Sequence, residues 1–499
     1  MFERDMVGSK AVKSASLPGV LAVLAALAGA LLASAPPVSA LPGGHVKVRA
    51  IPAFARKYGL PCSACHTAWP ELNNFGQVFR DNGYQLMNDR DSPIWQNPTY
   101  FPITIRITPN WHLENTTNQP VDSVPGDATS PTVSKTLQMN GFDLSGMDFW
   151  NTGTLFKNIS FSILPSSNAA AQFHFENAFV RFDNMVHTSW LNFRFGRFEL
   201  DNLISEKRFL FLSANGGLYQ NYHFAPRGDT NNFGVGDNQL GVELAGHSAN
   251  SYTRYSVAVL SSNEGTENLG SGSAPIPTIP AVNAGRTYDV FAAFSQAFSA
   301  GSQGYERFGA YAYVGERPTF ALTAGGVPIT GEGRGNKPFY RAGFAGDLFF
   351  LNSKLEFLPY YMHGYDNVYL GIAAPSNVPL ATACPPTVTC RGPQWNGGFL
   401  ETHYYYSPQL VFIGRYELIR MDQQAFSTNP GNQSNIDAYS IGYRWYPIMF
   451  SRAGLAFHNE FSITKSIGIT PLSLDGVAPL AANGKVWSSS LFIGFDFAF

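Results

Sequence analysis

Charged residues are scarce in this chain of 499 residues. Lys, Arg, Asp and Glu together make up 14% of it, against about 25% in an ordinary soluble domain. The formal net charge is −2, so the chain lacks the basic face that a nucleic-acid partner would require. Aromatic residues are abundant instead, at 14% with 40 Phe and 23 Tyr. This balance indicates a protein built for surroundings less aqueous than those of a soluble domain.

Long apolar runs are also missing after the first 40 residues. Beyond Ala40 nothing approaches the roughly 20 apolar residues that a membrane-spanning helix needs. The stretch Leu17–Leu32 follows Lys10 and Lys13 and precedes a small-residue cleavage site. We therefore predict a signal peptide over residues 1–40, with a retained membrane anchor as the alternative. Any membrane crossing after it must use strands.

Alternation of apolar and polar residues is clearest at the C-terminus. One face of the last segment carries Leu491, Ile493, Phe495, Phe497 and Phe499. This is the pattern of a transmembrane barrel strand with an outward apolar face. The terminal aromatic residue also resembles the signal that the outer-membrane barrel assembly machinery reads, so we expect that machinery and outer-membrane lipid as partners.

About sixteen such segments can be placed between Phe101 and Phe499. They are expected near 101–112, 136–150, 155–164, 171–184, 189–199, 234–246, 251–262, 287–299, 306–318, 337–350, 354–365, 396–406, 409–421, 435–446, 452–465 and 486–499. Short connections, such as Asn352-Ser353, alternate with long ones rich in Gly, Pro, Asn, Ser and Thr, such as 113–135. Short periplasmic turns, long outer loops and periplasmic termini are typical of outer-membrane barrels.

The sequence thus predicts a mainly β fold, an antiparallel barrel of about 16 strands over residues 101–499, placed in the bacterial outer membrane. Such a barrel has a lumen wide enough for water or a plug. Alternation assigns to its inside Glu176, Arg194, Glu243, Arg254, Arg415, Glu417 and Arg444. The strand histidines His174, His363, His403 and His458 form no recognisable cluster, and ordinary lumen or surface positions are expected for them.

The motif Cys62-Ser63-Ala64-Cys65-His66 is the C-x-x-C-H pattern of covalent haem attachment. The two thiols can each bond a vinyl group of one porphyrin, and the histidine can then bind the iron from the proximal side. We predict one haem c held by Cys62, Cys65 and His66 in a cytochrome segment over residues 41–100. A structural zinc site, the alternative, would need a second pair of ligands at suitable spacing, and the sequence offers none.

Two short helices are expected around this motif. One should run from Pro52 to Tyr58, with Gly59 ending it. The other should begin near Pro70 and run to Asn82, with Gly83 as a left-handed cap.

The second helix carries Leu72, Phe75 and Phe79 on one stripe, and Gly76 on that stripe would permit close approach of a flat ring. An apolar stripe is more often ordinary core than a cofactor wall. In a segment of sixty residues the porphyrin would itself be much of the core, so we expect Phe54, Phe75 and Phe79 to contact the haem.

The distal iron ligand is not settled by the sequence. Met87 is the leading candidate because it lies just past Gly83, where the chain could fold back over the ring. His45, His112 and a water molecule are alternatives. The two remaining cysteines, Cys384 and Cys390, are close together and predict a local disulfide in an oxidising compartment.

The N-terminal segment resembles the fused monohaem cytochrome–porins of bacterial outer membranes, whose best-known members are ferrous iron oxidases. The matching positions are Ala50, Pro52, Phe54-Ala55-Arg56, Cys62, Cys65-His66, Pro70, Leu72-Asn73, Phe75-Gly76, Phe79 and Gly83-Tyr84. The chain departs from the iron oxidases at Lys57-Tyr58-Gly59, where they have Gln-Thr-Gly, so the resemblance is more specific for the architecture than for iron as the substrate.

The resemblance implies electron transfer between an extracellular partner, with ferrous iron as the expected donor, and a periplasmic c-type cytochrome. The haem segment would plug the lumen or its mouth, with barrel side chains completing the pocket and iron giving its electron near the outer opening. Whether the protein is an enzyme of the iron-oxidase type stays open at this point. The alternatives are a diffusion porin with a structural or regulatory haem, electron export to an extracellular acceptor, and a haem enzyme such as a peroxidase.

Overall fold

The structure is a computed structural model. It describes residues 53–96, 102–127, 129–167, 173–200, 238–261, 288–319, 335–365, 394–421, 435–449, 453–467 and 485–499. The predicted signal peptide, His45 and the pair Cys384 and Cys390 lie outside these residues. The chain divides into the units 1–47 and 48–499, and all described residues belong to the second. Within them, no helix has the length and hydropathy needed to cross a membrane.

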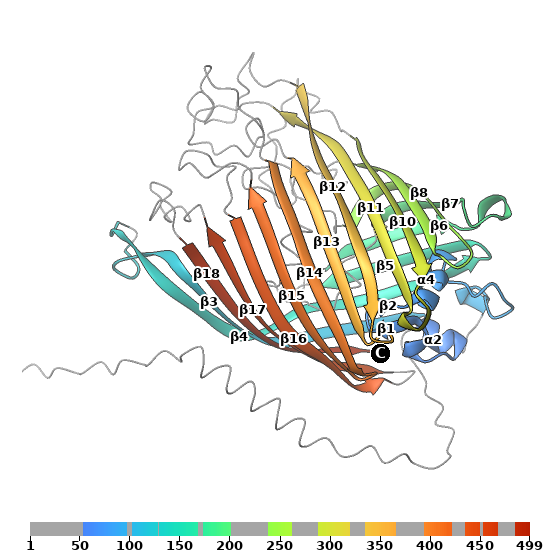
Figure 1. The fold of residues 1–499 in the computed structure, drawn as a ribbon, viewed down its shortest axis with the longest axis horizontal. Coiled ribbons are helices and arrows are strands. Elements are labelled where there is room, and N and C mark those ends of the chain that lie inside the picture. Colours follow the sequence, from blue (N-terminus) through green and yellow to red (C-terminus); the bar gives the residue numbers. More distant parts are fainter. Residues whose placement is uncertain are drawn as a thin grey trace, which may run out of the picture. The chain divides into compact units, whose positions relative to one another are not determined.

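Strands β3 to β18 form a closed barrel (Figure 1). Their bounds are β3 Ile103–Asp122, β4 Thr132–Phe156, β5 Ile159–Ser167, β6 Phe173–Phe182, β7 Asn192–Glu199, β8 Asn238–His247, β9 Thr253–Ser261, β10 Tyr288–Ser299, β11 Tyr305–Thr319, β12 Gly335–Phe350, β13 Leu355–Tyr365, β14 Gln394–Ser407, β15 Leu410–Met421, β16 Asn435–Met449, β17 Gly454–Ile467 and β18 Lys485–Ala498. Neighbours in the chain pair antiparallel, and β18 closes the barrel on β3. The predicted sixteen-stranded antiparallel barrel is confirmed.

One predicted connection is wrong. The stretch 113–135 is mostly strand, because β3 continues to Asp122 and β4 begins at Thr132. The two strands stay paired through Asn115 opposite Gln138 and beyond. This part of the hairpin is held by its backbone ladder, and its polar residues give no apolar alternation from which a strand could be predicted.

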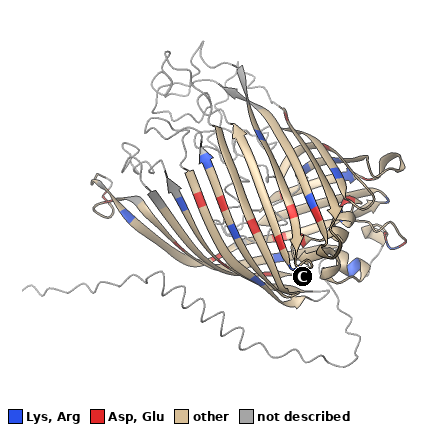
Figure 2. Cartoon of the chain, viewed as in Figure 1, with Lys and Arg blue, Asp and Glu red and all other residues tan. Residues whose placement is uncertain are grey.

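Alternation separates an exposed apolar face, as predicted, from a buried inner face that carries apolar residues such as Phe291, Tyr313 and Trp395 beside polar ones. In β18, Phe492, Asp496 and Ala498 are buried, whereas Ile493 and Phe495 are exposed. Six of the seven charged residues predicted to face inward are buried: Arg194, Glu243, Arg254, Arg415, Glu417 and Arg444. Figure 2 shows how sparse the charged residues are on the strand ribbons. A barrel of this kind can face lipid outside and polar groups inside.

The N-terminal segment is small and mixed. It comprises α2 Ala53–Tyr58, α3 Cys62–Cys65, β1 His66–Ala68, β2 Glu71–Leu72, α4 Asn74–Asp81 and the 3₁₀ turn η1 Ile94–Gln96. The first predicted helix is confirmed, since α2 ends at Tyr58 and Gly59 adopts a φ of +66°.

The second helix begins four residues later than predicted. Residues 66–72 form an antiparallel pair, β1 with β2, in place of a first helical turn. The side chain of Asn73 then caps α4 by accepting a hydrogen bond from the Gly76 amide at 3.0 Å. Leu72 therefore lies on a strand, outside the helical stripe expected for it. Gly83, at a φ of +71°, ends the helix as predicted.

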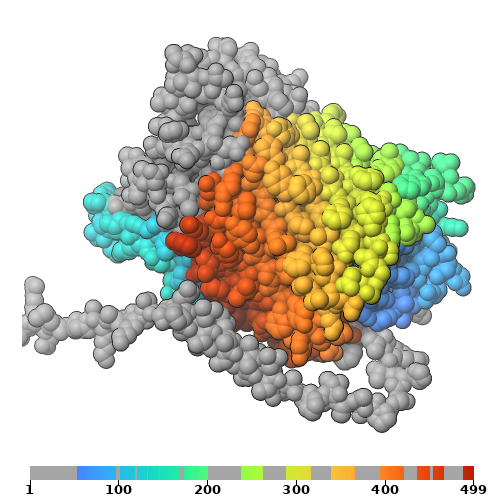
Figure 3. Space-filling model, in the orientation of Figure 1, coloured from blue at the N-terminus to red at the C-terminus, as the bar shows by residue number. Residues whose placement is uncertain are grey.

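This segment lies at one end of the barrel (Figures 1 and 3), where it contacts barrel side chains. The first and last strands meet at this end, since Ile105 at the start of β3 exchanges backbone hydrogen bonds with the terminal Phe499. The short turns lie at the same end of the barrel. The Ala53 amide donates to the Thr104 hydroxyl at 3.0 Å, and Tyr446 donates to the Trp69 carbonyl at 2.7 Å. A hydrophobic cluster continues the contact, with Ala68 and Trp69 packed among Phe349, Tyr405, Val411, Ile413, Tyr446 and Ala456.

Candidate functional site: a cofactor-sized cavity between the N-terminal segment and the barrel

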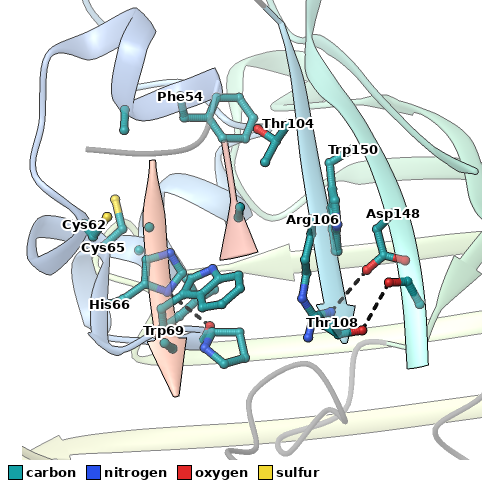
Figure 4. Close-up of a pocket in the computed structure, with 18 of the residues that line it drawn as sticks. Phe54, Cys62, Cys65, His66, Trp69, Thr104, Arg106, Thr108, Asp148 and Trp150 are labelled. Atoms are coloured by element: carbon teal, nitrogen blue, oxygen red, sulfur yellow. Dashed lines mark hydrogen bonds and ion pairs between the residues drawn. The ribbon is translucent and has the colours of Figure 1, made fainter. Parts of the chain in front are cut away.

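A cavity of about 510 Å³ lies between the N-terminal segment and the inner wall of the barrel. This volume falls within the range of about 300–1,000 Å³ that is usual for cofactor and ligand sites. Cys62, Cys65, His66 and Trp69 face it from the segment, as Figure 4 shows, with Arg106 and Trp150 among the barrel residues across from them. The two parts of the chain therefore enclose one site together.

The two motif cysteines occupy opposite ends of the single-turn helix α3 and both line the cavity. Residues three apart on a helix share a face, so both thiols can reach one ring system. Neither forms a disulfide. Burial, with the neighbouring Cys62, raises the pKa of the Cys65 thiol to about 11, so the group is a neutral thiol at neutral pH.

The side chain of His66 is fixed by the turn that follows it. Its Nδ1 lies 3.1 Å from the carbonyl oxygens of both Pro70 and Glu71. Carbonyl oxygens only accept hydrogen bonds, so Nδ1 carries the proton and Nε2 has a free lone pair. Burial lowers the pKa of His66 to about 4. The imidazole is therefore held neutral, in the tautomer and with the backbone support usual for metal-binding histidines.

Aromatic residues form the wall beside the motif. Phe54 packs edge-on against Phe79 with ring centroids 5.0 Å apart, and stacks on Tyr84 at 5.1 Å. All three line the cavity, and contact of Phe54 and Phe79 with a haem stays a prediction. Phe75 is not among the lining residues and is 44% exposed, because it stands in the first turn of α4 where the described chain does not cover it.

Gly76 lines the cavity, so close approach of a flat ring to it stays a prediction, and the glycine also has a packing role. A Cβ at this position would collide with the carbonyl group of Cys65. The missing side chain therefore allows α4 to pack directly against the α3 backbone, which fixes the motif relative to the helix.

Of the residues proposed as distal ligands, the two that the structure describes, Met87 and His112, do not line the cavity. Met87 is 45% exposed and does not line it. His112 also lies off the cavity wall, with Nε2 close to Ser490 and Glu114 at 2.8 and 3.2 Å. Other potential iron ligands do line the cavity: His174 of β6, Met449 of β16 and His458 of β17, whose two ring nitrogens already contact Arg444 and Glu460. Only the closure of the barrel brings these strand residues near the motif, so no local sequence signal could have identified them.

The polar part of the cavity wall is internally paired. Arg106 forms two ion pairs: its Nε lies 2.9 Å from Asp496 Oδ1, and its Nη1 lies 3.2 Å from Asp148 Oδ2. His458 also lines the cavity, and its two nitrogens contact Arg444 and Glu460. The wall thus combines an aromatic face on the segment with a charge-balanced face on the barrel.

His403 is the strand histidine whose setting the sequence did not reveal. It is fully buried and contacts Glu71 of β2 and Glu356 of β13. The signal available in the sequence was the alternation Glu401-x-His403-x-Tyr405, which places three polar side chains on the inner face of β14.

The chain matches no protein-family model and no curated protein. Among solved structures it is similar to the outer-membrane channel DcaP of Acinetobacter baumannii, with 12% identity over 79% of this chain and 97% of that one and a TM-score of 0.45. An anion-selective porin from Comamonas acidovorans gives 11% identity over 80% and 99% of the two chains, with a TM-score of 0.43. OprB of Pseudomonas putida gives 11% over 79% and 94%, with a TM-score of 0.42.

Proposed function

We propose that this protein is an outer-membrane c-type cytochrome whose barrel and N-terminal segment together hold one haem and carry electrons between an extracellular partner and a periplasmic c-type cytochrome. The observation that supports this most directly is the convergence of Cys62, Cys65 and His66 on a cofactor-sized cavity that the barrel completes. A segment of this size buries only a modest core of its own, and the inner wall of the barrel would add cover for the haem.

Each residue of the motif has a defined task in this proposal. Cys62 and Cys65 would bind the haem covalently, and His66 would bind its iron through Nε2. Phe54 and Phe79 exclude water from one side of the cavity. The haem, when bound, supplies reversible one-electron chemistry at its iron. His174 and Met449, which also line the cavity, would be candidates to bind the iron besides His66, and a second protein ligand would favour electron transfer over peroxidase-like chemistry.

The proposed location rests on the barrel. Its exposed apolar face suits a bilayer, whose apolar layer about 30 Å thick blocks free electron transfer. With the short turns and both termini in the periplasm, the cavity lies at the periplasmic end, although the sequence led us to expect electron uptake near the outer opening. An extracellular donor would then have to enter the lumen, which a small ion such as ferrous iron could do.

The choice of ferrous iron as donor rests on the resemblance of the N-terminal segment to the iron-oxidising cytochrome–porins. To test it, the air-oxidised holoprotein is mixed anaerobically with ferrous iron while the haem absorption bands are followed. Reduction at the working pH of the organism is expected. If no reduction occurs, iron is not the donor, whereas a conduit for another partner, including electron export outward, would still stand.

A diffusion porin with a structural haem is the second candidate, favoured by the closed barrel alone. It requires an open lumen, which the contacts of the N-terminal segment with β3, β9, β14 and β16 oppose. Liposome swelling with small sugars distinguishes the two. Swelling by the intact holoprotein would support the porin.

A further inference from the structure

We infer that Glu71, Glu356 and His403, with the Tyr405 hydroxyl, form a second metal site that binds a divalent transition-metal ion between the N-terminal segment and the barrel wall. Glu71 comes from β2, Glu356 from β13 and the other two from β14. The inference does not depend on the haem, because none of these four residues lines the haem cavity.

The potential ligand atoms already converge. One oxygen or nitrogen from each of Glu71, Glu356 and His403 lies within 4.8 Å of the others. His403 Nδ1 is 2.8 Å from Glu356 Oε2 and 3.1 Å from Glu71 Oε2. The Tyr405 hydroxyl lies 2.5 Å and 2.7 Å from the same two oxygens. Four donor groups from three strands therefore point at one place.

His403 has the outer partners of a metal-binding histidine. Its other ring nitrogen, Nε2, lies 2.7 Å from Glu401 Oε1, and Arg415 donates to the second oxygen of that carboxylate at 3.0 Å. A carboxylate that accepts the second N–H of a ligating imidazole fixes the tautomer and orients the ring. Here it would leave Nδ1 free to bind an ion.

Charge also favours a cation at this place. Other buried acidic groups at this end of the barrel have an arginine partner: Asp81 pairs with Arg254, Glu243 with Arg194 and Asp496 with Arg444. Glu71 and Glu356 are 5% and 1% exposed, and among the described residues their ion-pair partner is His403, which is charged only when protonated, with no lysine or arginine beside it. Two buried carboxylates facing each other are costly unless a proton or a cation is shared between them.

The donor set indicates the class of ion. One imidazole and two carboxylates suit Fe²⁺, Mn²⁺ or Zn²⁺, and the lack of thiolate disfavours softer ions. Such an ion would tie the segment to β13 and β14. It would also stand close to the proposed haem ligand, since His66 Nδ1 is hydrogen-bonded to the backbone carbonyl of Glu71.

The test measures metal binding directly. Purified full-length holoprotein is equilibrated with Mn²⁺ or Zn²⁺, passed through a desalting column and measured by mass spectrometry for metal per chain. We expect about one ion per chain for the wild type. Glu356→Gln and His403→Gln should each weaken metal binding by about 10- to 100-fold or more. Losses of 10- to 100-fold already follow when only a hydrogen-bond partner of a metal ligand is changed.

Glu460→Gln is the matched control. Glu460 of β17 lies two positions from His458, as Glu401 does from His403, and is equally buried, but it belongs to no three-ligand group among the described residues. It should bind metal as the wild type does. The shift in electrophoretic mobility on heating shows that each variant contains a folded barrel.

Two results would overturn the site: no ion bound by the wild type, or equal binding by wild type, Glu356→Gln and His403→Gln. Either would mean that the cluster is a proton-sharing network. Neither would affect the haem spectrum, so the failure of this site is distinguishable from the failure of the proposed electron transfer.

Discussion

Asp81 and Arg254, which are 173 positions apart in the chain, form a two-contact ion pair inside the barrel. Arg254 Nε lies 2.8 Å from Asp81 Oδ2, and Nη2 lies 3.0 Å from Oδ1. Asp81 ends helix α4 and Arg254 stands near the start of β9, and both are buried. The pair therefore fixes the helix that follows the haem motif to the barrel wall.

Replacing Arg254 by methionine should release this helix. The variant leaves the Asp81 carboxylate buried without its arginine, which costs about 3–5 kcal/mol in buried pairs. Amide protons of α4 should then exchange about 10²- to 10³-fold faster in hydrogen-exchange mass spectrometry, while amide protons of the barrel strands keep their protection.

Arg420→Met provides the control. Arg420 also pairs with an aspartate, Asp437, but its side chain is 39% exposed, and exposed pairs contribute about 0–1 kcal/mol. Unchanged exchange of α4 in Arg254→Met would show that the ion pair does not hold the segment.

Covalent haem attachment gives the second prediction. Cys62→Ala and Cys65→Ala should each remove one of the two bonds to the haem, and the double variant should lose haem completely under denaturing conditions. Ser63→Ala, a change between the two cysteines, should keep full attachment. The measurement is the mass of the mature chain with its in-gel haem peroxidase stain. A wild-type chain whose mass equals that of the polypeptide alone would refute the cytochrome proposal.

The sequence was enough for the barrel because two independent patterns agreed. Apolar alternation marked each strand, and the connections marked the strand ends, so sixteen strands followed without any knowledge of their pairing. The exception was the polar extension of the β3–β4 hairpin, which backbone hydrogen bonds hold without an apolar pattern. A strand whose polar side chains have no preferred face leaves no alternation in the sequence from which it could be predicted.

The site could be predicted only in part. Cys62, Cys65 and His66 are adjacent in the chain, so their shared chemistry was visible in the motif. Met449 and His403 reach the segment only through closure of the barrel, and contacts at such sequence separation leave no local signature. Met87 seemed suitable because it is close in sequence to the motif, but the structure leaves it exposed.

Gly83 provides a third prediction, on packing. It has a φ of +71°, and a Cβ there would meet the carboxylate of Asp183. That carboxylate cannot move aside cheaply, since it is 2.7 Å from both Arg181 Nε and the Ser160 hydroxyl. Gly83→Ala should therefore destabilise the segment by about 2–4 kcal/mol, the sum of left-handed strain and overpacking.

Gly59→Ala separates the two contributions to that cost. Gly59 has nearly the same φ, +66°, but nothing lies within 4 Å of the Cβ position. Its cost should be the backbone strain alone, about 1–2 kcal/mol. Hydrogen exchange of α2 and α4 amides measures both variants. Equal effects would mean that the contact with Asp183 contributes nothing.

The orientation of the barrel decides which compartment the proposed haem cavity faces, and this orientation can be tested on whole cells. A short peptide tag is inserted after Gly126, in the β3–β4 connection, or after Asn352, in the turn between β12 and β13. The space around a Cβ at Gly126 is open, and Asn352 is exposed, so both sites should accept the insertion.

Because short turns of outer-membrane barrels face the periplasm, an antibody should label intact cells through the first tag only. The second tag should become accessible once the outer membrane is permeabilised. The opposite pattern would put the cavity at the cell surface, where an extracellular donor could reach it without entering the lumen.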